Sequence, residues 1–210
     1  TDGIFQNQAE IDAHALQPGA QPGDLRFVDG DGDGVVEFGS EDDLAVIGNP
    51  IPKMTLGFNL NLDYKGLDFA TSLYASIGND AARSYERFLT YSNKSRLYLD
   101  RWTGEGTSNT TPRASTNASN NYLFSDFFVE DASFLRIQNV QLGYSIPAST
   151  LEKIKMDKVR IYVAANNLYT FTKYSGYNPD VSNANPSAAG VDLGQYPQTR
   201  TYTLGINVSF

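Results

Sequence analysis

One stretch of the sequence alternates apolar and polar residues without interruption over eleven positions. From Met54 to Tyr64 the even-numbered residues are apolar: Met54, Leu56, Phe58, Leu60, Leu62 and Tyr64. The odd-numbered residues are Thr55, Gly57, Asn59, Asn61 and Asp63. Because successive side chains of a β-strand point to opposite faces, this pattern predicts a strand with one apolar and one polar face.

Four further stretches repeat the alternation. We predict strands over Leu67–Gly78, Phe134–Ile146, Val159–Tyr169 and Thr201–Phe210. The first of these follows Tyr64 after the dipeptide Lys65-Gly66, in which glycine supplies the positive φ of a two-residue hairpin turn. Such a hairpin pairs Tyr64 with Leu67, so the apolar residues of both strands share one face.

The predicted strands fit the thickness of a membrane better than the size of a soluble β-domain. Eleven residues at ~3.3 Å each, tilted by ~45°, rise ~25 Å, which is the height of the apolar band of an outer-membrane β-barrel. Strands of ordinary β-sandwiches have ~5–6 residues. In Phe134–Ile146 the residues Leu135 and Ile137 have the opposite parity to Val140 and Leu142, which indicates either a β-bulge or a strand that runs beyond the membrane.

The connections between the strands alternate in length. Lys65-Gly66 and 147–158 are short, whereas 79–133 and 171–200 are long and rich in Asn, Ser, Thr and Pro. Outer-membrane barrels have short periplasmic turns and long extracellular loops. We therefore predict an all-β fold in which 54–210 supplies the five C-terminal antiparallel strands of a large transmembrane β-barrel, and 1–53 is an extracellular loop segment. Five strands cannot close a barrel, so we expect this chain to be a fragment of a larger one.

The charge of the chain is concentrated in one segment. Between Asp24 and Asp43 lie eight acidic residues and one basic residue, so this segment carries −7 of the net charge of −8. A negative chain of this kind is not expected to bind nucleic acid. Such a local accumulation of acids favours a cation-binding site. The absence of cysteine excludes disulfide bonds and Cys-ligated metal sites.

The acidic segment contains the spacing of an EF-hand calcium loop. Asp29, Asp31 and Asp33 occupy relative positions 1, 3 and 5, Gly34 occupies position 6, and the backbone carbonyl of Val35 falls at position 7. Position 12 should be acidic but is Ser40, and the acids Glu41, Asp42 and Asp43 follow directly, so a longer loop could bring the last ligand. The alternative is a solvated acidic turn that binds no metal.

No catalytic constellation is recognisable, and we do not expect an enzyme. His14 is the only histidine and lies in a polar N-terminal stretch, without a nucleophile motif elsewhere. Aromatic residues in the predicted loops are candidates for stacking on sugars or for contacting a partner, although an interfacial girdle or packing within the loops explains each of them better. These residues are Tyr85, Tyr91, Trp102, Tyr122, Tyr174, Tyr177 and Tyr196. No residue can be assigned to substrate binding.

Short motifs along nearly the whole chain resemble the C-terminal part of SusC/RagA-type TonB-dependent outer-membrane transporters. The matching stretches are Pro22–Gly34, Ile47–Pro52, Gly57–Phe69, Gly78–Asp80, Arg101–Thr103, Phe128–Arg136, Leu142–Pro147, Val163–Thr172, Tyr174–Pro179 and Tyr196–Gly205. The resemblance implies a plugged barrel in the Gram-negative outer membrane that imports oligosaccharides or peptides. It also implies that Asp43, after an insertion of about three residues, takes the place of the last acid of the calcium loop.

The family also implies partners. These are a SusD-like surface lipoprotein that acts as a lid, the plug and remaining barrel strands of the same transporter, and TonB, which contacts the plug. The barrel wall would contact lipid, and the mouth a glycan or peptide substrate. The alternative hypothesis is a secreted β-domain that binds carbohydrate and is stabilised by calcium. Solubility of the isolated segment without detergent would favour that alternative.

Overall fold

A computed structural model describes residues 1–85, 95–115, 119–152, 155–181 and 185–210. The chain divides into two compact units. One, here called the loop unit, comprises Thr1–Gly48, Ala82–Glu130 and Val191–Gly194. The other, here called the strand unit, comprises Asn49–Ala81, Asp131–Gly190 and Gln195–Phe210. No helix in the described ranges is long and apolar enough to cross a membrane.

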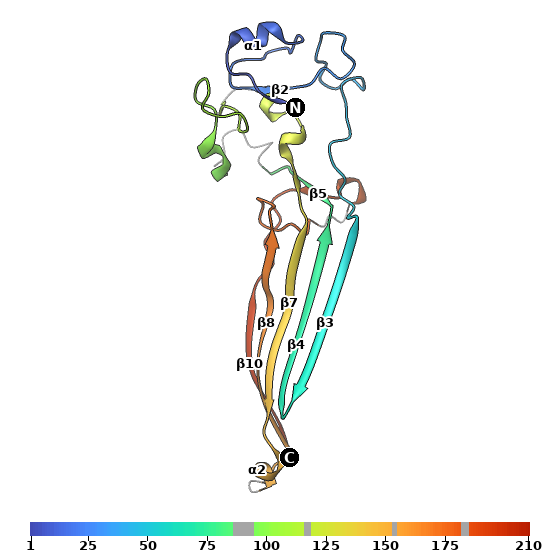
Figure 1. The fold of residues 1–210 in the computed structure, drawn as a ribbon, viewed down its shortest axis with the longest axis vertical. Coiled ribbons are helices and arrows are strands. Elements are labelled where there is room, and N and C mark those ends of the chain that lie inside the picture. The colour runs from blue at the N-terminus through green and yellow to red at the C-terminus, as the bar shows by residue number, and fades with distance from the viewer. Residues whose placement is uncertain (86–94, 116–118, 153–154, 182–184) are drawn as a thin grey trace. The chain divides into compact units, whose positions relative to one another are not determined.

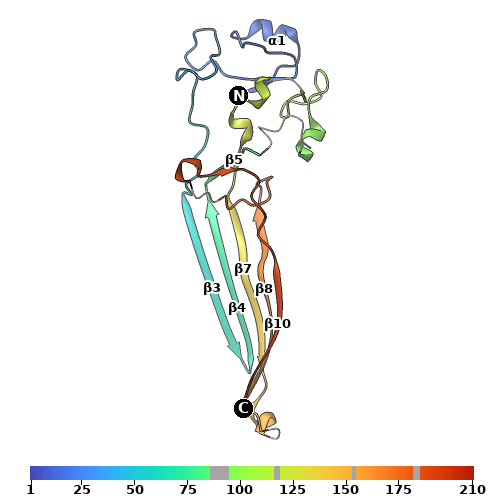
Figure 2. The same cartoon turned by 180° about the vertical axis from the view of Figure 1, so that it is seen from behind.

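The strand unit is built on one antiparallel sheet of five long strands. Its strands are β3 (Met54–Tyr64), β4 (Leu67–Ile77), β7 (Phe134–Ser145), β8 (Lys158–Thr172) and β10 (Thr201–Ser209). They lie in the order β10-β8-β7-β4-β3, as Figures 1 and 2 show from opposite sides. The predicted antiparallel β fold is confirmed, and the five strands form an open sheet rather than a closed barrel. The helix α2 (Ala148–Leu151) lies in the connection between β7 and β8.

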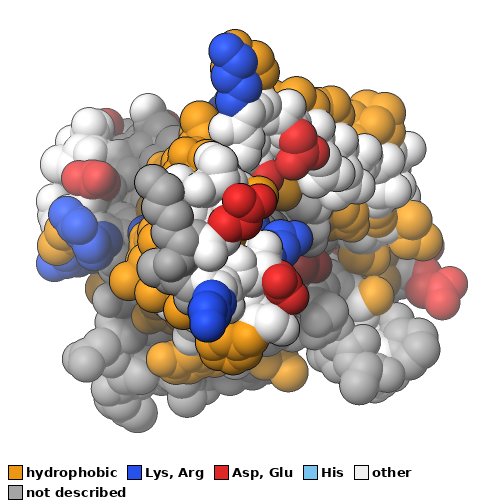
Figure 3. Space-filling model, turned by 90° about the horizontal axis from the view of Figure 1, so that it is seen from below, with side chains coloured by type: hydrophobic (Ala, Val, Ile, Leu, Met, Phe, Trp, Pro, Cys, Tyr) orange, Lys and Arg blue, Asp and Glu red, His pale blue; other side chains and the backbone are white. Residues whose placement is uncertain are grey.

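The register places the apolar residues of all five strands on one face. Tyr64 pairs with Leu67 across the hairpin, as the turn predicts. One row across the sheet consists of Leu62, Phe69, Leu142, Val163 and Leu204. The neighbouring row contains Thr71, whose hydroxyl donates to the carbonyl of Asn139 (3.0 Å), so this polar group is satisfied on an apolar face. Seen along the strands in Figure 3, most hydrophobic side chains gather in outer bands and polar and charged side chains lie between them.

A bulge preserves this apolar face where the sequence parity changes. On β7, Ser72 pairs with Asn139 and Leu73 pairs with Ile137, so Gln138 is the extra residue. On β8, two residues are inserted at the same level, and one of them, Asn167, has φ +51°. The bulge alternative is therefore confirmed. Gln138 returns Leu135 and Ile137 to the face that carries Val140 and Leu142, and their partners on β8, Phe171 and Tyr169, lie on the same face.

The opposite face of the sheet is polar and contains an ion pair between two non-adjacent strands. The guanidinium of Arg160 on β8 donates to Asp68 on β4, with Nε to Oδ1 at 2.9 Å. The strand between them contributes Gly143, where a Cβ would lie 2.5 Å from both Arg160 and Asp68. Gly143 therefore gives the two side chains room to meet across β7. Asn139 and Asn166 form a further side-chain hydrogen bond on this face (2.8 Å).

A buried arginine joins the end of the same face to the segment that follows β8. Arg136 is 3 % exposed, and its guanidinium donates to Thr170 Oγ1 (3.1 Å), Asn178 Oδ1 (3.0 Å) and Asp180 Oδ2 (3.0 Å). Its guanidinium also lies 4.7 Å from the centroid of the Phe134 ring. These contacts hold residues 178–180 against the sheet. A small apolar cluster of Ala81, Ala132 and Tyr174, with Val181 packed on it, lies in the same unit.

The loop unit has little regular structure. It contains β1 (Gly3–Ile4) paired with β2 (Leu25–Arg26), the helix α1 (Gln8–Ala13), and the short 3₁₀ helices η1 (Arg96–Asp100), η2 (Asn120–Tyr122) and η3 (Asp126–Phe128). Its buried apolar residues include Phe5, Leu25, Val36 and Phe128. A second small sheet has the strand order β6-β5-β9 and consists of β5 (Asp80–Arg83), β6 (Val129–Asp131) and β9 (Val191–Asp192). The 3₁₀ helix η5 (Pro186–Ala188) belongs to the strand unit.

One acidic residue of the charged segment serves the packing of the loop unit. Asp24 is fully buried, and its carboxylate accepts hydrogen bonds from Arg113 Nε (2.7 Å), Asn121 Nδ2 (2.9 Å) and the amide of Gln21 (3.0 Å). Asp24 therefore joins its own segment to Arg113 and Asn121, which are 89 and 97 residues away in sequence. The preceding residue, Gly23, packs under Trp102, because a Cβ there would lie 2.4 Å from the indole ring.

Candidate metal centre

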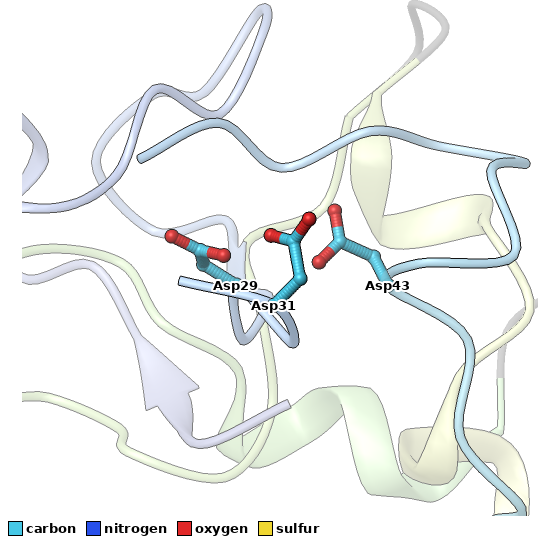
Figure 4. Close-up of side chains that lie close together, drawn as sticks. All are labelled: Asp29, Asp31 and Asp43. Atoms are coloured by element: carbon cyan, nitrogen blue, oxygen red, sulfur yellow. The ribbon is translucent and has the colours of Figure 1, made fainter. Parts of the chain in front are cut away.

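Three of the predicted calcium ligands lie together in the loop unit. Carboxylate oxygens of Asp29, Asp31 and Asp43 all lie within 4.8 Å of one another. Figure 4 shows the carboxylates of Asp31 and Asp43 pointing toward each other, with Asp29 on the other side of Asp31. Asp43 is fourteen residues from Asp29 along the chain. The tertiary structure thus brings to the loop the same acid that the family resemblance singles out.

Glycines allow the backbone to turn around Asp29. The Asp29 carboxylate accepts hydrogen bonds from the amides of Gly32 (2.7 Å) and Gly34 (2.9 Å). Gly32 has φ +77° and Gly34 has φ +92°, a left-handed conformation that residues with a Cβ rarely adopt. The alternation of Asp and Gly therefore has a conformational cause at Gly32 and Gly34, where the backbone turns through the left-handed region.

Asp43 is held by the backbone of the same loop. Its Oδ1 accepts from the amide of Gly30 (2.6 Å), and its Oδ2 accepts from the amide of Glu37 (2.7 Å). The middle of the loop is attached to Leu16, which donates to the Gly34 carbonyl (2.8 Å) and accepts from the Val36 amide (2.9 Å). The start, the middle and the end of the acidic segment are thereby drawn into one compact turn.

The other predicted ligands are placed differently. Within the described residues, the acidic group that could hold an ion does not include Asp33, whose Oδ1 accepts from the Val35 amide (2.8 Å). Val35 forms an isolated bridge with Leu16, and neither backbone bond of that bridge uses the Val35 carbonyl. Ser40, at the twelfth position, donates to Asp42 Oδ2 (2.9 Å).

The electrostatics of the cluster follow from carboxylates that lie close to one another. The pKa of Asp29 is held below its ordinary value, chiefly by the hydrogen bond from the Gly34 amide. For Asp31 the amide of Asp33 acts to lower the pKa, but desolvation and the charges of Asp33 and Asp29 outweigh it, so the pKa of Asp31 is raised. Closely spaced carboxylates with several free oxygen lone pairs are the donor set that a hard cation such as Ca²⁺ prefers.

The loop aromatics fall into different environments. Trp102 packs on Gly23 and donates from Nε1 to Gln6 (3.1 Å), and Tyr122 donates to the carbonyl of Ser115 (2.7 Å). Tyr174 is buried, whereas Tyr177 and Tyr196 are 71 % and 84 % exposed. Tyr85 lies beside Gly194, and Tyr91 lies outside the described residues. Packing within the protein therefore accounts for Trp102, Tyr122 and Tyr174.

Sequence reasoning grouped Asp24 with the cation-binding acids, and the structure assigns it to the core. In the sequence, Asp24 differs from Asp29, Asp31 and Asp33 only in lying outside the alternation of Asp with Gly, and this difference does not show that Asp24 is buried. Its partner Arg113 lies in a long loop, at a separation in sequence for which no periodic pattern exists.

Comparison with known proteins shows what the chain is similar to. No protein-family model matches it. It is 32 % identical to TonB-dependent receptor P3 of Formosa agariphila over 99 % of its own length and 21 % of that receptor. It is 30 % identical to TonB-dependent receptor SusC of Bacteroides thetaiotaomicron over 99 % of its own length and 20 % of that receptor.

A solved structure agrees with these relatives. The RagAB peptide importer in its open-open state superposes with a TM-score of 0.67 and 27 % identity, covering 88 % of this chain and 20 % of the importer chain. The chain spans about a fifth of the length of the curated relatives it matches. Its sequence and its sheet of long antiparallel strands thus agree with one group of proteins: the chain is similar, over nearly its whole length, to a part of TonB-dependent receptors such as SusC and of the RagAB importer.

Proposed function

We propose that this chain forms part of the wall and the extracellular mouth of a TonB-dependent importer in the outer membrane of a Gram-negative cell. The observation that carries the proposal is the apolar face of the five-stranded sheet. Its side chains remain exposed within the described chain, for example Leu62 (54 %), Val163 (50 %) and Leu204 (74 %). A water-soluble domain would cover such a face, whereas lipid tails provide an apolar environment without any protein layer.

The polar face of the sheet fits the lumen of such a barrel. It carries the Asp68–Arg160 pair and the hydrogen-bonded asparagines Asn139 and Asn166. The cargo that we propose is an oligosaccharide or a peptide, the latter by analogy with RagAB, which is described as a peptide importer. We further propose that the mouth docks a SusD-like surface lipoprotein, and that the plug and TonB drive import.

Cysteine accessibility tests the orientation of the wall. The chain contains no cysteine, so Asn61→Cys and Leu62→Cys would each introduce one reactive site on neighbouring residues of β3. In outer membranes that contain the complete receptor, we expect a charged maleimide to label Asn61→Cys at least about tenfold faster than Leu62→Cys. Equal labelling, or recovery of the receptor in the soluble fraction, would contradict the proposal. Uptake of labelled oligosaccharide or peptide that depends on TonB is the accompanying measurement of transport.

We also propose that the acidic loop binds calcium and thereby stiffens the mouth. Asp29, Asp31 and Asp43 would supply carboxylate oxygens, and the predicted ligands Asp33 and the Val35 carbonyl could join after a small rearrangement. The support is the clustering of the three acids and the raised pKa of Asp31, which indicates repulsion that a cation would relieve. When bound, the ion would neutralise these charges and restrain residues 29–43.

Proteolysis in calcium and in chelator tests this site. We expect the combined change Asp29→Ala and Asp33→Ala to weaken calcium binding by about tenfold or more and to remove the protection of residues 29–43 by calcium. Asp43→Ala alone should also weaken binding, because Asp43 closes the cluster. Glu41→Ala, an exposed acid of the same segment, is the matched control and should leave protection intact. If the double variant is cleaved as slowly in calcium as the unmodified receptor, the loop does not bind the ion.

A further inference from the structure

A hollow opens on the apolar face of the sheet near the end that carries the long connections. Its volume is about 610 Å³, within the range of small-molecule sites. Seven apolar side chains from β3, β4, β7 and β8 line it: Leu56, Ala75, Ile77, Phe134, Leu135, Tyr169 and Phe171. All of these residues belong to the strand unit.

The hollow exists because a small residue lies in a row of large ones. The register places Leu56, Ala75, Leu135 and Phe171 side by side across four strands. Ala75 is the smallest of them and is 6 % exposed, so the side chains of its neighbours extend farther from the sheet than its methyl group does. Tyr169 and Phe171 form a further wall, with ring centroids 4.6 Å apart. The result is an apolar depression rather than a flat surface.

Polar groups lie along one edge of the hollow. Asp131, Ser133, Thr172 and Lys173 complete its lining. Asp131 accepts from the Ser133 amide (2.9 Å), and Thr172 donates to the Ser133 carbonyl (2.9 Å). Lys173 is exposed, and within the described residues no carboxylate lies within ion-pair distance of its ammonium group. The lining thus changes from apolar to polar across Phe134 and Thr172, the last paired residues of β7 and β8, and Lys173 shares this polar edge with the carboxylate of Asp131.

We propose that this hollow binds one acyl chain of a membrane lipid whose phosphate headgroup contacts Lys173. The inference rests on the proposed placement of the apolar face in the membrane. An acyl chain fills an apolar depression, and a phosphate next to it matches a lysine at the interface between membrane and water. A second receptor copy would require a broad matching surface, whereas the hollow has the size and polarity of a single amphiphilic molecule.

The test uses the complete receptor in phosphatidylcholine nanodiscs with a trace of phosphatidic acid that carries a photoreactive acyl chain. We expect cross-links on β4 and β7 peptides, competed by unlabelled phosphatidic acid but not by inorganic phosphate. Ala75→Leu fills the hollow and should reduce cross-linking by about tenfold. Ala70→Leu, the same change on the polar face of β4, is the matched control and should not.

A second pair of variants tests the headgroup. Lys173→Gln should reduce the preference for phosphatidic acid over phosphatidylcholine by about fivefold, whereas Lys65→Gln in the β3–β4 turn should leave it unchanged. Unchanged cross-linking in Ala75→Leu would overturn the proposal, as would cross-links between two receptor copies at the hollow. If the Ala75→Leu receptor does not insert into the nanodiscs, Ala75→Val is used in its place, and unchanged cross-linking would again overturn the proposal. Cysteine labelling of β3 tests the membrane placement of the apolar face and does not depend on the hollow. It therefore distinguishes failure of the lipid-binding proposal from failure of the proposed membrane placement.

Discussion

Replacement of Asp24 by alanine is expected to destabilise the loop unit by about 3 kcal/mol, the lower end of the range for breaking a buried ion pair. The carboxylate is fully buried, and its removal leaves the Arg113 guanidinium, the Asn121 amide group and the Gln21 amide without their acceptor. Because Arg113 retains 22 % exposure, solvent compensates part of the loss. Amide hydrogen exchange at Leu25 and Asn121 in the complete receptor measures the free energy of local opening.

Two variants separate the buried pair from the general acidity of the segment. Asp42→Ala removes an exposed carboxylate that accepts a side-chain bond from Ser40 only, and should change the opening free energy by less than about 0.5 kcal/mol. Asp24→Asn retains the size of the side chain and one oxygen acceptor, so its effect should be intermediate. If Asp24→Ala and Asp42→Ala have equal effects, Asp24 does not hold its segment against Arg113 and Asn121.

Leu60→Arg is expected to cost about 2–4 kcal/mol in the free energy of unfolding of the receptor from lipid. Leu60 lies near the middle of β3 and on its apolar face, where it pairs with Thr71. A charged guanidinium near the middle of a bilayer must be dehydrated or must draw water into the membrane. Urea titration of the receptor folded into lipid vesicles measures the change.

The neighbouring residue provides the control for this prediction. Asn59 pairs with Ser72 in the row that continues to Asn139 and Asn166, all on the polar face. Asn59→Arg should therefore cost little, because its guanidinium would extend into the wet lumen. Equal costs for the two variants would show that the assignment of the two faces is wrong.

The strand sheet was largely predictable because period-two alternation records which face each residue occupies. In β3 and β4 the pattern and the two-residue turn specify the same register, and the observed pairing of Tyr64 with Leu67 agrees with it. The bulge at Gln138 was visible as a change of parity, although a strand running beyond the membrane would have had the same pattern. Only the pairing with β4 and β8 decides between them.

The acidic loop shows where local pattern stops being sufficient. The spacing of Asp29, Asp31 and Asp33 predicted a cation loop, but the structure groups Asp29 and Asp31 with Asp43 and turns Asp33 to the Val35 amide. The consecutive acids Glu41, Asp42 and Asp43 all follow the Asp-Gly stretch. Which of them lies beside Asp29 and Asp31 depends on the path of residues 35–42, where the sequence has no periodic pattern. The family resemblance, rather than the spacing, selected Asp43.

By itself, the sequence determined the strands, their two faces and the Asp-Gly turn, because each depends on residues within a few positions of one another. The tertiary structure alone decided that Asp24 is buried against Arg113, that Arg136 holds Asn178 and Asp180, and that Ala75 lies among Leu56, Leu135 and Phe171. These contacts join residues separated by 19 to 96 positions in sequence, and their energies arise only when pairing and burial bring the segments together.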